Sequence, residues 1–484
     1  MTPSEQNQSG AVGRLARFVR LALSTHDHDF TRGSLRKAVL LLALPMVLEP
    51  LMEALFTVAD ALFVGRLGAD ALAVLGLTEG VVTLVYTVGF GLGIPVTAMI
   101  ARRIGEHDHE GAARVAVQAN IVALLVGSLL GVVGALYGRE ALALMGASPE
   151  VIALGGPYAA ITLGSTPVIV LLFVNAAIFR GAGDAVVALR ALWLANGINL
   201  LLDPCLIFGL GPFPEWGVTG AAAATVVGRG VGAVYLIWCL LRGTSRLSFS
   251  RRHLRVEVPL MRELGRLSVG GIGQLLVETS SWVILARIVA LSGSVAIAGY
   301  TVALRVLVFA LMPAWGLAGA AATLVGQNLG AQQPERATRA LWLTGIVNSA
   351  FLGAVTIVCL TLAGPITAAF TPDAEVQAVA AFGVRVVALG YVFYAWGMVL
   401  TQAFNGAGDT RTPFILNLVC FWAFKLPLAY FLSKSVGVTS GPAGVFWAIC
   451  VAYSLNATLA FVWFRSGRWK RGFERGMMTS KPEA

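Results

Sequence analysis

The chain carries little charge for its length. Only 12% of its 484 residues are Asp, Glu, Lys or Arg, whereas such residues make up about 25% of a typical soluble domain. Hydrophobic residues make up 57%, and the mean hydropathy is +0.79. A chain of this composition cannot cover a water-exposed surface with polar side chains, so we exclude a soluble protein and predict an integral membrane protein.

Cysteine is scarce and shows no metal-binding pattern. All five cysteines lie inside apolar runs, and no two of them form a C-x-x-C pair. In such surroundings cysteine packs as a small apolar side chain, in preference to forming disulfides or binding metal. We therefore expect no bound metal and no organic cofactor.

The net charge of +10 is compatible with nucleic-acid binding, but a membrane protein has another reason for it. Lys and Arg accumulate in the cytoplasmic loops of membrane proteins. We expect the lipid bilayer as a partner and no nucleic acid, and we expect a monomer.

Long apolar runs separated by Gly, Pro or charged residues predict twelve transmembrane helices. They lie at residues 37–66, 70–101, 112–137, 151–179, 185–210, 217–241, 263–291, 295–327, 335–362, 376–404, 411–434 and 441–464. Several runs are longer than a bilayer requires, so we expect tilts or kinks, notably at Pro45, Pro50 and Pro95.

The basic residues predict the orientation. Most of the 35 Lys and Arg residues fall at the two ends of the sequence and in every second loop, while the intervening loops hold only Arg66, Arg139 and Lys434. We therefore expect a multi-pass protein of the plasma (inner) membrane with both termini cytoplasmic, which an even number of spans also requires.

The second half of the chain repeats the first. The hexapeptide FRGAGD at 179–184 returns as FNGAGD at 404–409, and the same offset of 225 places Glu53 on Glu278. This predicts two pseudo-symmetric six-helix lobes around a central cavity, an arrangement that suits a transporter. The expected parts are a basic amino-terminal arm (1–35), an amino lobe (36–242), a cytoplasmic linker (243–262), a carboxy lobe (263–465) and a basic tail (466–484).

The repeated G-A-G-D allows a second interpretation, because G-x-G-D also marks the aspartate of intramembrane proteases. Such an enzyme needs a partner aspartate at the same depth in the bilayer, whereas both copies fall at a cytoplasmic turn between helices. There Gly can end one helix and Asp184 or Asp409 can cap the next. We favour the turn and predict that the protein is not an enzyme.

Charged residues inside the predicted spans are costly, and each needs a partner, a proton or a water-filled cavity. The acids are Glu49, Glu53, Asp60, Glu79, Asp203 and Glu278, and the bases are Arg229, Arg287, Arg305, Arg385 and Lys425. For the five bases, pairing with an acid for structural reasons is as good an explanation as a functional role.

The acids have helical spacing. Glu49, Glu53 and Asp60 share one face of the first span, and Asn199 and Asp203 lie four residues apart in the fifth. A carboxyl group removed from water disfavours its charged form, so Asp60 or Asp203 could bind and release a proton. Carboxylate and Asn oxygens could equally hold Na⁺, so the sequence does not decide between H⁺ and Na⁺ as the bound ion.

Four stretches resemble the multidrug and toxic compound extrusion (MATE) transporters. ALPMVLEPLMEALFTVADALFVGRLGADALA is similar to the first helix of that family, NAAIFRGAGD and NGINLLLDPCLIFG to the fourth and fifth, and LLVETSSW to the seventh. The resemblance covers about residues 35–465. It implies a twelve-helix, two-lobe exporter driven by inward movement of H⁺ or Na⁺.

The resemblance also implies site residues. Those that match the cation- and proton-binding cluster of the amino lobe are Asp60, Asn175, Asn199, Asp203 and, less closely, Thr225. Glu278 matches an acid of the carboxy lobe, whereas Tyr394 stands where one branch carries an aspartate. Glu49 and Glu53 stand where relatives often have amides, which favours a cavity for cationic substrates.

The resemblance, taken with these features, predicts a secondary active transporter that exports drugs or organic, cationic compounds in antiport with H⁺ or Na⁺ by alternating access, so that its partner is a small-molecule drug or metabolite. A flippase for lipid-linked oligosaccharides, from the same superfamily, is the alternative. The intramembrane protease is the third reading and the least favoured.

Overall fold

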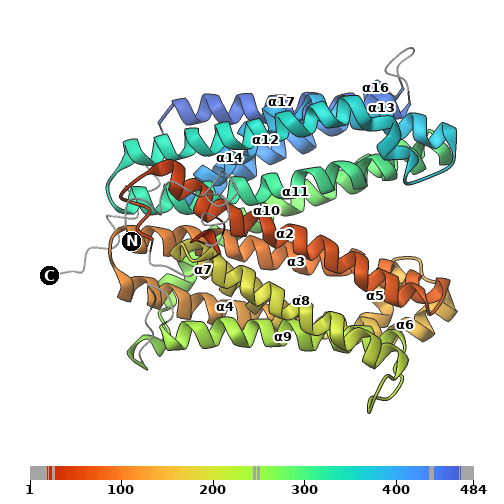
Figure 1. Ribbon diagram of the computed structural model, residues 1–484, viewed down its shortest axis with the longest axis horizontal. Coiled ribbons are helices and arrows are strands. Elements are labelled where there is room, and N and C mark those ends of the chain that lie inside the picture. The colour runs from red at the N-terminus through yellow and green to blue at the C-terminus, as the bar shows by residue number, and fades with distance from the viewer. Residues whose placement is uncertain are drawn as a thin grey trace, which may run out of the picture.

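The computed structural model describes residues 19, 21–23, 28–243, 247, 251–434, 441–467 and 469. Most of the expected amino-terminal arm and tail, and part of the expected linker, lie outside the described residues. Within the described ranges every regular element is a helix (Figure 1).

Two groups of helices follow one another along the chain. The first half contains α2 (Leu35–Gly65), α3 (Ala69–Gly105), α4 (His109–Leu136), α5 (Gly138–Leu144), α6 (Pro149–Gly164), α7 (Thr166–Ala182), α8 (Ala185–Phe208) and α9 (Val218–Arg242). After the short η1 (Arg251–Leu254), the second half contains α10 (Val258–Ala290), α11 (Ser294–Gly330), α12 (Pro334–Ala368), α13 (Ala374–Leu389), α14 (Tyr391–Gly406), α15 (Arg411–Asn417), η2 (Leu418–Lys425), α16 (Leu426–Ser433) and α17 (Pro442–Arg465).

The predicted all-helical membrane fold is confirmed. Among the described residues, eleven helices are long and apolar enough to cross a bilayer, and the pair α13 and α14, bent by 55°, makes a twelfth candidate when taken as one span. Each predicted run coincides with one of these spans. The expected kinks at Pro45 and Pro50 do not interrupt α2, which continues through both prolines.

The structure adds details that hydropathy did not give. The short α5 follows α4, and α10 begins at Val258, inside the stretch expected to be a linker. The fourth span divides at Ser165 and the tenth at Gly390, which are again 225 residues apart. The repeat therefore includes the break in the fourth helix of each half.

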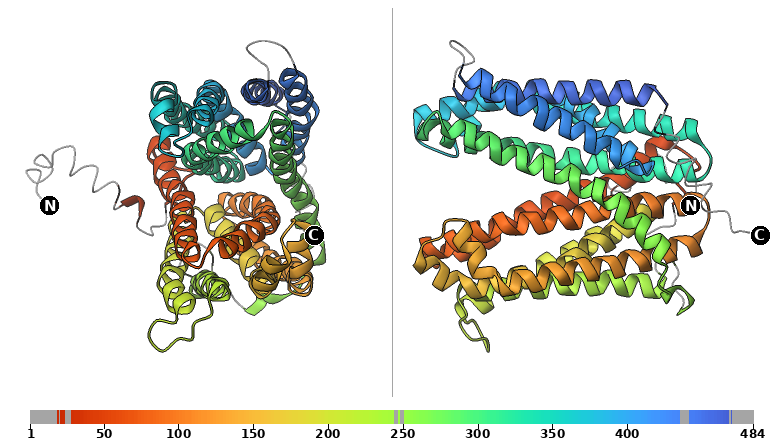
Figure 2. Two further views of the ribbon diagram at one scale, coloured as in Figure 1. Left: turned by 90° about the vertical axis from the view of Figure 1, so that its right-hand side faces the viewer. Right: turned by 180° about the vertical axis from the view of Figure 1, so that it is seen from behind.

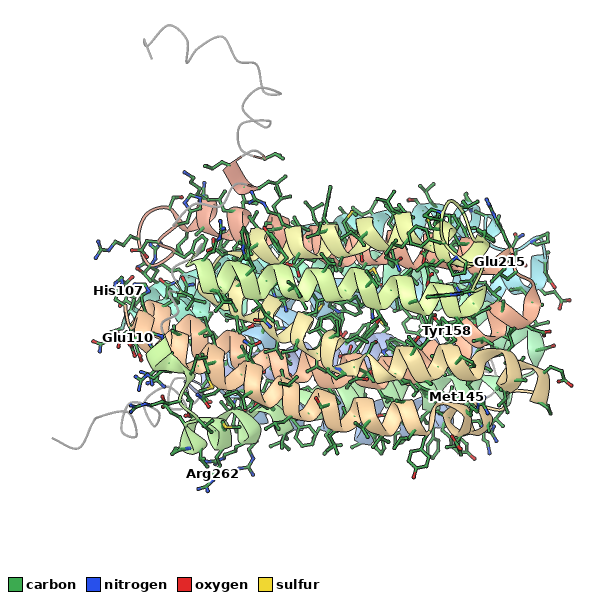
Figure 3. The ribbon with its side chains drawn as sticks, turned by 90° about the horizontal axis from the view of Figure 1, so that it is seen from below. His107, Glu110, Met145, Tyr158, Glu215 and Arg262 are labelled. Carbon is green, nitrogen blue, oxygen red and sulfur yellow. The ribbon has the colours of Figure 1, made fainter. Side chains whose placement is uncertain are left out.

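Each half has its own apolar core, and the two groups of helices diverge toward one end (Figure 2). One further cluster joins them, because Leu42 and Met46 of α2 pack with Leu317 and Leu324 of α11. Figure 3 labels His107, Glu110 and Arg262 at one end of the bundle, which we call the basic end, and Met145 and Glu215 toward the other, the far end.

The two halves meet near the basic end through glycine. A methyl group on Gly105 of α3 would overlap the main-chain oxygen of Gln327, and one on Gly330 of α11 would overlap that of Arg102. These two contacts are equivalent under the 225-residue offset, so α3 and α11 cross each other at a pseudo-two-fold axis that relates the two halves. Glycine permits this close approach of two backbones because it has no side chain.

A second pair of contacts obeys the same symmetry. A methyl group on Gly91 of α3 would lie 2.6 Å from Cα of Ile272 in α10, and one on Gly316 of α11 would lie 2.7 Å from Cα of Val47 in α2. Ile272 and Val47 are also 225 residues apart. The first helix of each half therefore packs against the second helix of the other half.

We expect Gly105→Ala to destabilise the protein, because the added methyl group forces α3 and α11 apart. Overpacking of this kind costs about 1–3 kcal/mol. Thermal unfolding of the detergent-solubilised protein measures the effect. Gly353→Ala in α12 is the matched control, since a methyl group there meets no atom within 4 Å. Equal melting temperatures for the two variants would contradict the proposed crossing.

Candidate functional site

The helix α8 places two predicted site residues on its buried side. Asp203 is fully buried and Asn199 nearly so. In the amide orientation that satisfies both neighbours, Asn199 Nδ2 donates to Asp203 Oδ2 at 2.9 Å. Its Oδ1 accepts from the hydroxyl and the main-chain N–H of Thr225 in α9, at 3.0 and 2.8 Å. Asn199, Asp203 and Thr225 therefore form one hydrogen-bonded group, as the resemblance implied.

Arg229 of α9 is the basic neighbour of the acids on α2 and α3. Its Nη2 lies 3.3 Å from Glu53 Oε1, and its guanidinium stacks over the ring of Tyr86, 5.1 Å from the centroid. Asp60 and Glu79 interact with Arg229 electrostatically. The sequence marked Arg229 only as a charge within a span, because nothing in it shows that α9 faces α2.

Carboxyl groups outnumber bases in this cluster. Asp60 also interacts with Asp203 and Glu79, so this cluster holds four acids, counting Glu53, and the one guanidinium of Arg229; Asp203 is fully buried, whereas Glu79 is exposed. One oxygen of Asp60 is buried without a hydrogen-bond partner in the described part of the chain. An unpaired buried carboxylate is costly, so such a group is suited to bind a proton or a small cation.

Glu49 and Glu53 add less negative charge to the interior than their number suggested. Glu49 Oε2 lies 2.7 Å from Arg180 Nη1, and both side chains are about 15% exposed. Glu53 faces Arg229 in the same way. The negative charge expected of the cavity therefore comes mainly from Asp60, Glu79 and Asp203.

Asn175 has its own partner. It exchanges two hydrogen bonds with Asn120 of α4, at 2.7 and 3.2 Å, and donates to the main-chain oxygen of Leu171 at 2.8 Å. Asn120 belongs to no motif that we recognised, and only the packing of α4 on α7 reveals it. The predicted role of Asn175 in ion binding stays a prediction.

The second half holds Glu278 and Tyr394 together. The Tyr394 hydroxyl lies 3.2 Å from Glu278 Oε1 and donates to it, and the Tyr394 ring stacks on Tyr453 at 3.8 Å. Tyr394 thus supplies a hydroxyl donor to the carboxylate of Glu278. Lys425 lies close by in η2 and interacts electrostatically with Glu278.

Both G-A-G-D copies form turns between helices. Gly183 and Gly408 have φ of 95° and 81°, the left-handed conformation that glycine adopts without strain. Asp409 accepts from the main-chain N–H of Thr412 at 3.0 Å, as predicted. Asp184 stands at the N-cap position of α8 but makes no side-chain capping hydrogen bond there, so that part of the prediction is wrong.

The MatE family model matches the chain twice, at residues 45–205 and 272–431. The chain belongs to the MATE family. It is therefore a membrane transporter and not an enzyme, and the double match agrees with the 225-residue repeat. We therefore reject the hypothesis of a G-x-G-D intramembrane protease.

The chain is similar to several curated MATE relatives over nearly their whole length. It is 27% identical to the "Probable multidrug resistance protein NorM" of Thermotoga maritima over 90% of this chain and 94% of that protein. It is 24% identical to the "Multidrug export protein MepA" of Staphylococcus haemolyticus, over 89% and 93%. It is 26% identical to the "FAD transporter" of Shewanella oneidensis, over 85% and 91%.

Solved structures show the same fold. A structure titled "Outward-facing conformation of a multidrug resistance MATE family transporter of the MOP superfamily" matches with a TM-score of 0.85 and 26% identity, over 93% of this chain and 99% of that chain. A MOP superfamily transporter from Pyrococcus furiosus, described by the reverse polarity of its binding pocket, matches with the same score and identity over 92% and 99%.

The repeat supplies a test of the Glu49–Arg180 pair. At the equivalent positions of the second half, Gln274 and Asn405 form a neutral amide pair with N–O distances of 3.1 and 3.2 Å. We expect Glu49→Gln alone to destabilise the protein by about 3–5 kcal/mol, because it leaves the buried Arg180 without its carboxylate.

The double variant Glu49→Gln/Arg180→Asn copies the pair of the second half and should recover most of that loss. Chemical unfolding of wild type, Glu49→Gln, Arg180→Asn and the double variant gives the comparison. Strictly additive losses in the double variant would refute the pairing.

Proposed function

We propose that this protein exports small organic compounds, including drugs and with a preference for cationic ones, in antiport with H⁺ or Na⁺ by alternating access. The observation that carries the proposal is the excess of carboxyl groups over bases around Arg229. The printed names of its relatives, which include multidrug exporters, support export of small molecules.

The coupling ion binds at Asp60 and Asp203 in this proposal. Asp60 has a buried oxygen that lacks a partner within the described residues, and Asp203 is joined through Asn199 to Thr225. A proton or Na⁺ neutralises one of these groups and removes part of the cost of burying it. Coupling follows if the ion and the drug favour different conformations.

The described conformation joins the two halves at the basic end. Thr323 Oγ1 of α11 donates to the main-chain oxygen of Arg180 at 2.9 Å, and Gln327 Nε2 donates to that of Gly181 at 3.0 Å. The first G-A-G-D turn is therefore bonded to the second half. With the basic end in the cytoplasm, this conformation is the outward-facing one of the cycle.

The orientation can be tested by thiol labelling. In a background with the five native cysteines replaced, we expect Glu215→Cys to react with a membrane-impermeant maleimide added to intact cells, because Glu215 lies at the far end. Glu335→Cys, whose side chain is 87% exposed at the start of α12 on the basic side, should react only after the cells are opened. The reverse pattern would contradict a cytoplasmic basic end.

We expect Asp60→Asn and Asp203→Asn to reduce ion-driven efflux at least tenfold, because neither amide can take up a proton or balance a cation. The assay uses proteoliposomes loaded with ethidium, with H⁺ and Na⁺ gradients imposed separately. Glu140→Gln is the matched control, because Glu140 is an exposed residue of α5. Wild-type rates in both aspartate variants would refute the assignment.

The same vesicles test the charge of the substrate. A flavin dinucleotide, which is anionic, serves as the second probe, since one relative carries the name "FAD transporter". Faster transport of the flavin than of ethidium would refute the preference for cations and leave the coupling site standing.

A further inference from the structure

Lys425 is a charged residue of the second half that the mechanism above does not use. It lies at the end of η2, in the middle of a predicted span, and it is only 1% exposed. A lysine ammonium buried this deeply in a membrane protein requires compensation.

Two aromatic rings and a hydroxyl group surround the ammonium group of Lys425, and we call this set of side chains (Trp282, Phe421 and Ser281) the seat. Lys425 Nζ lies 4.7 Å from the ring centroid of Trp282 and 4.6 Å from that of Phe421. It donates to Ser281 Oγ at 2.9 Å. Two ring faces and an oxygen acceptor are the features by which proteins bind organic ammonium ions.

Glu278 supplies the opposite charge to this seat. It lies one helical turn before Ser281, whose hydroxyl donates to the Glu278 main-chain oxygen at 2.7 Å. The carboxylate interacts electrostatically with Lys425 and accepts from Tyr394. The acid therefore has a hydrogen-bond donor on α14 and a cation on η2.

The repeat shows that the two halves differ in sign at corresponding helices. Lys425 corresponds to Leu200 of α8, and Asp203 of α8 corresponds to Leu428 of α16. The fifth helix of the first half thus carries an acid, Asp203, whereas the fifth helix of the second half carries a base, Lys425. Asp60 has only Leu285 as its equivalent.

We propose that Lys425 is a covalently attached cation that lies between the rings of Trp282 and Phe421, hydrogen-bonded to Ser281 and electrostatically balanced by Glu278, and that it fills a site that would otherwise bind a free organic ammonium ion. The second half therefore needs no mobile cation to balance Glu278. Ion coupling then belongs to the first half alone, a consequence that rests on the antiport proposed above.

Chemical rescue with a free amine tests the seat. Lys425→Ala removes the tethered cation and leaves space beside Glu278. We expect n-butylammonium to bind there and to raise the melting temperature of the detergent-solubilised full-length variant by about 3 °C or more in a saturable manner. n-Butanol, which has the same chain without the charge, should have no such effect.

Two proteins serve as controls. Wild type, with its seat filled, and Lys425→Ala/Glu278→Gln, without the carboxylate, should not respond to n-butylammonium. An equal response in all three proteins, or none in Lys425→Ala, would overturn the proposal. The measurement involves neither a gradient nor a drug, so its failure leaves the Asp60 and Asp203 assignment intact.

Should Lys425→Ala not fold, the pair can be tested without a cavity. Glu278→Gln and Lys425→Met should each lower the melting temperature, and the double variant should lie closer to wild type than either single variant, since no unpaired charge remains. Additive losses would overturn the proposal.

Discussion

The single guanidinium of Arg229 constrains the interior of the first half. Glu53 of α2 lies 3.3 Å from it, Asp60 of α2 and Glu79 of α3 interact with it electrostatically, and Asp203 of α8 interacts with Asp60. One base cannot balance four carboxylates, and the imbalance is most costly for Asp203, which is fully buried, and for Asp60, which is half-buried, whereas Glu79 is exposed. In the antiport proposed above, a proton or cation taken from outside the chain supplies the missing positive charge.

The halves share their geometry more closely than their chemistry. The backbone contacts of Gly105 and Gly330 are equivalent, and so are the breaks at Ser165 and Gly390. At other equivalent positions the side chains have diverged from an ion pair to an amide pair, or from an acid to an apolar residue. A symmetric scaffold with asymmetric charge is what the proposed antiport requires, in which the halves move together and only one of them responds to an ion.

The sequence was sufficient for the spans and the repeat, because both depend on local composition and on direct comparison of residues. It also placed Asn199, Asp203 and Thr225 in one group, through the family resemblance. It could not show that Glu49 faces Arg180 or that Asn120 faces Asn175, since these pairs join residues 131 and 55 positions apart. Such contacts depend on the rotation of each helix about its own axis. Because all sides of a membrane helix are apolar, the sequence does not show which side faces which neighbour.

The two G-A-G-D turns illustrate the same limit at short range. Their glycines behave alike, because the left-handed conformation is a property of the backbone. Their aspartates differ: Asp409 precedes Thr412, whose N–H and hydroxyl both donate to it, whereas the equivalent of Thr412 is Val187. A repeated motif thus predicts a repeated fold more securely than a repeated hydrogen bond.

The glycine contacts of α3 with α10, at Gly91, and of α11 with α2, at Gly316, have a mechanical consequence. Backbones that touch without interlocking side chains can tilt about the point of contact with little change in what they touch, as a pivot does. From Gly91 to the start of α3 at Ala69, and from Gly316 to the start of α11 at Ser294, the lever arm is 22 residues, or about 33 Å at 1.5 Å per residue. A tilt of about 10° then displaces each far end by about 6 Å, roughly half the diameter of a helix with its side chains.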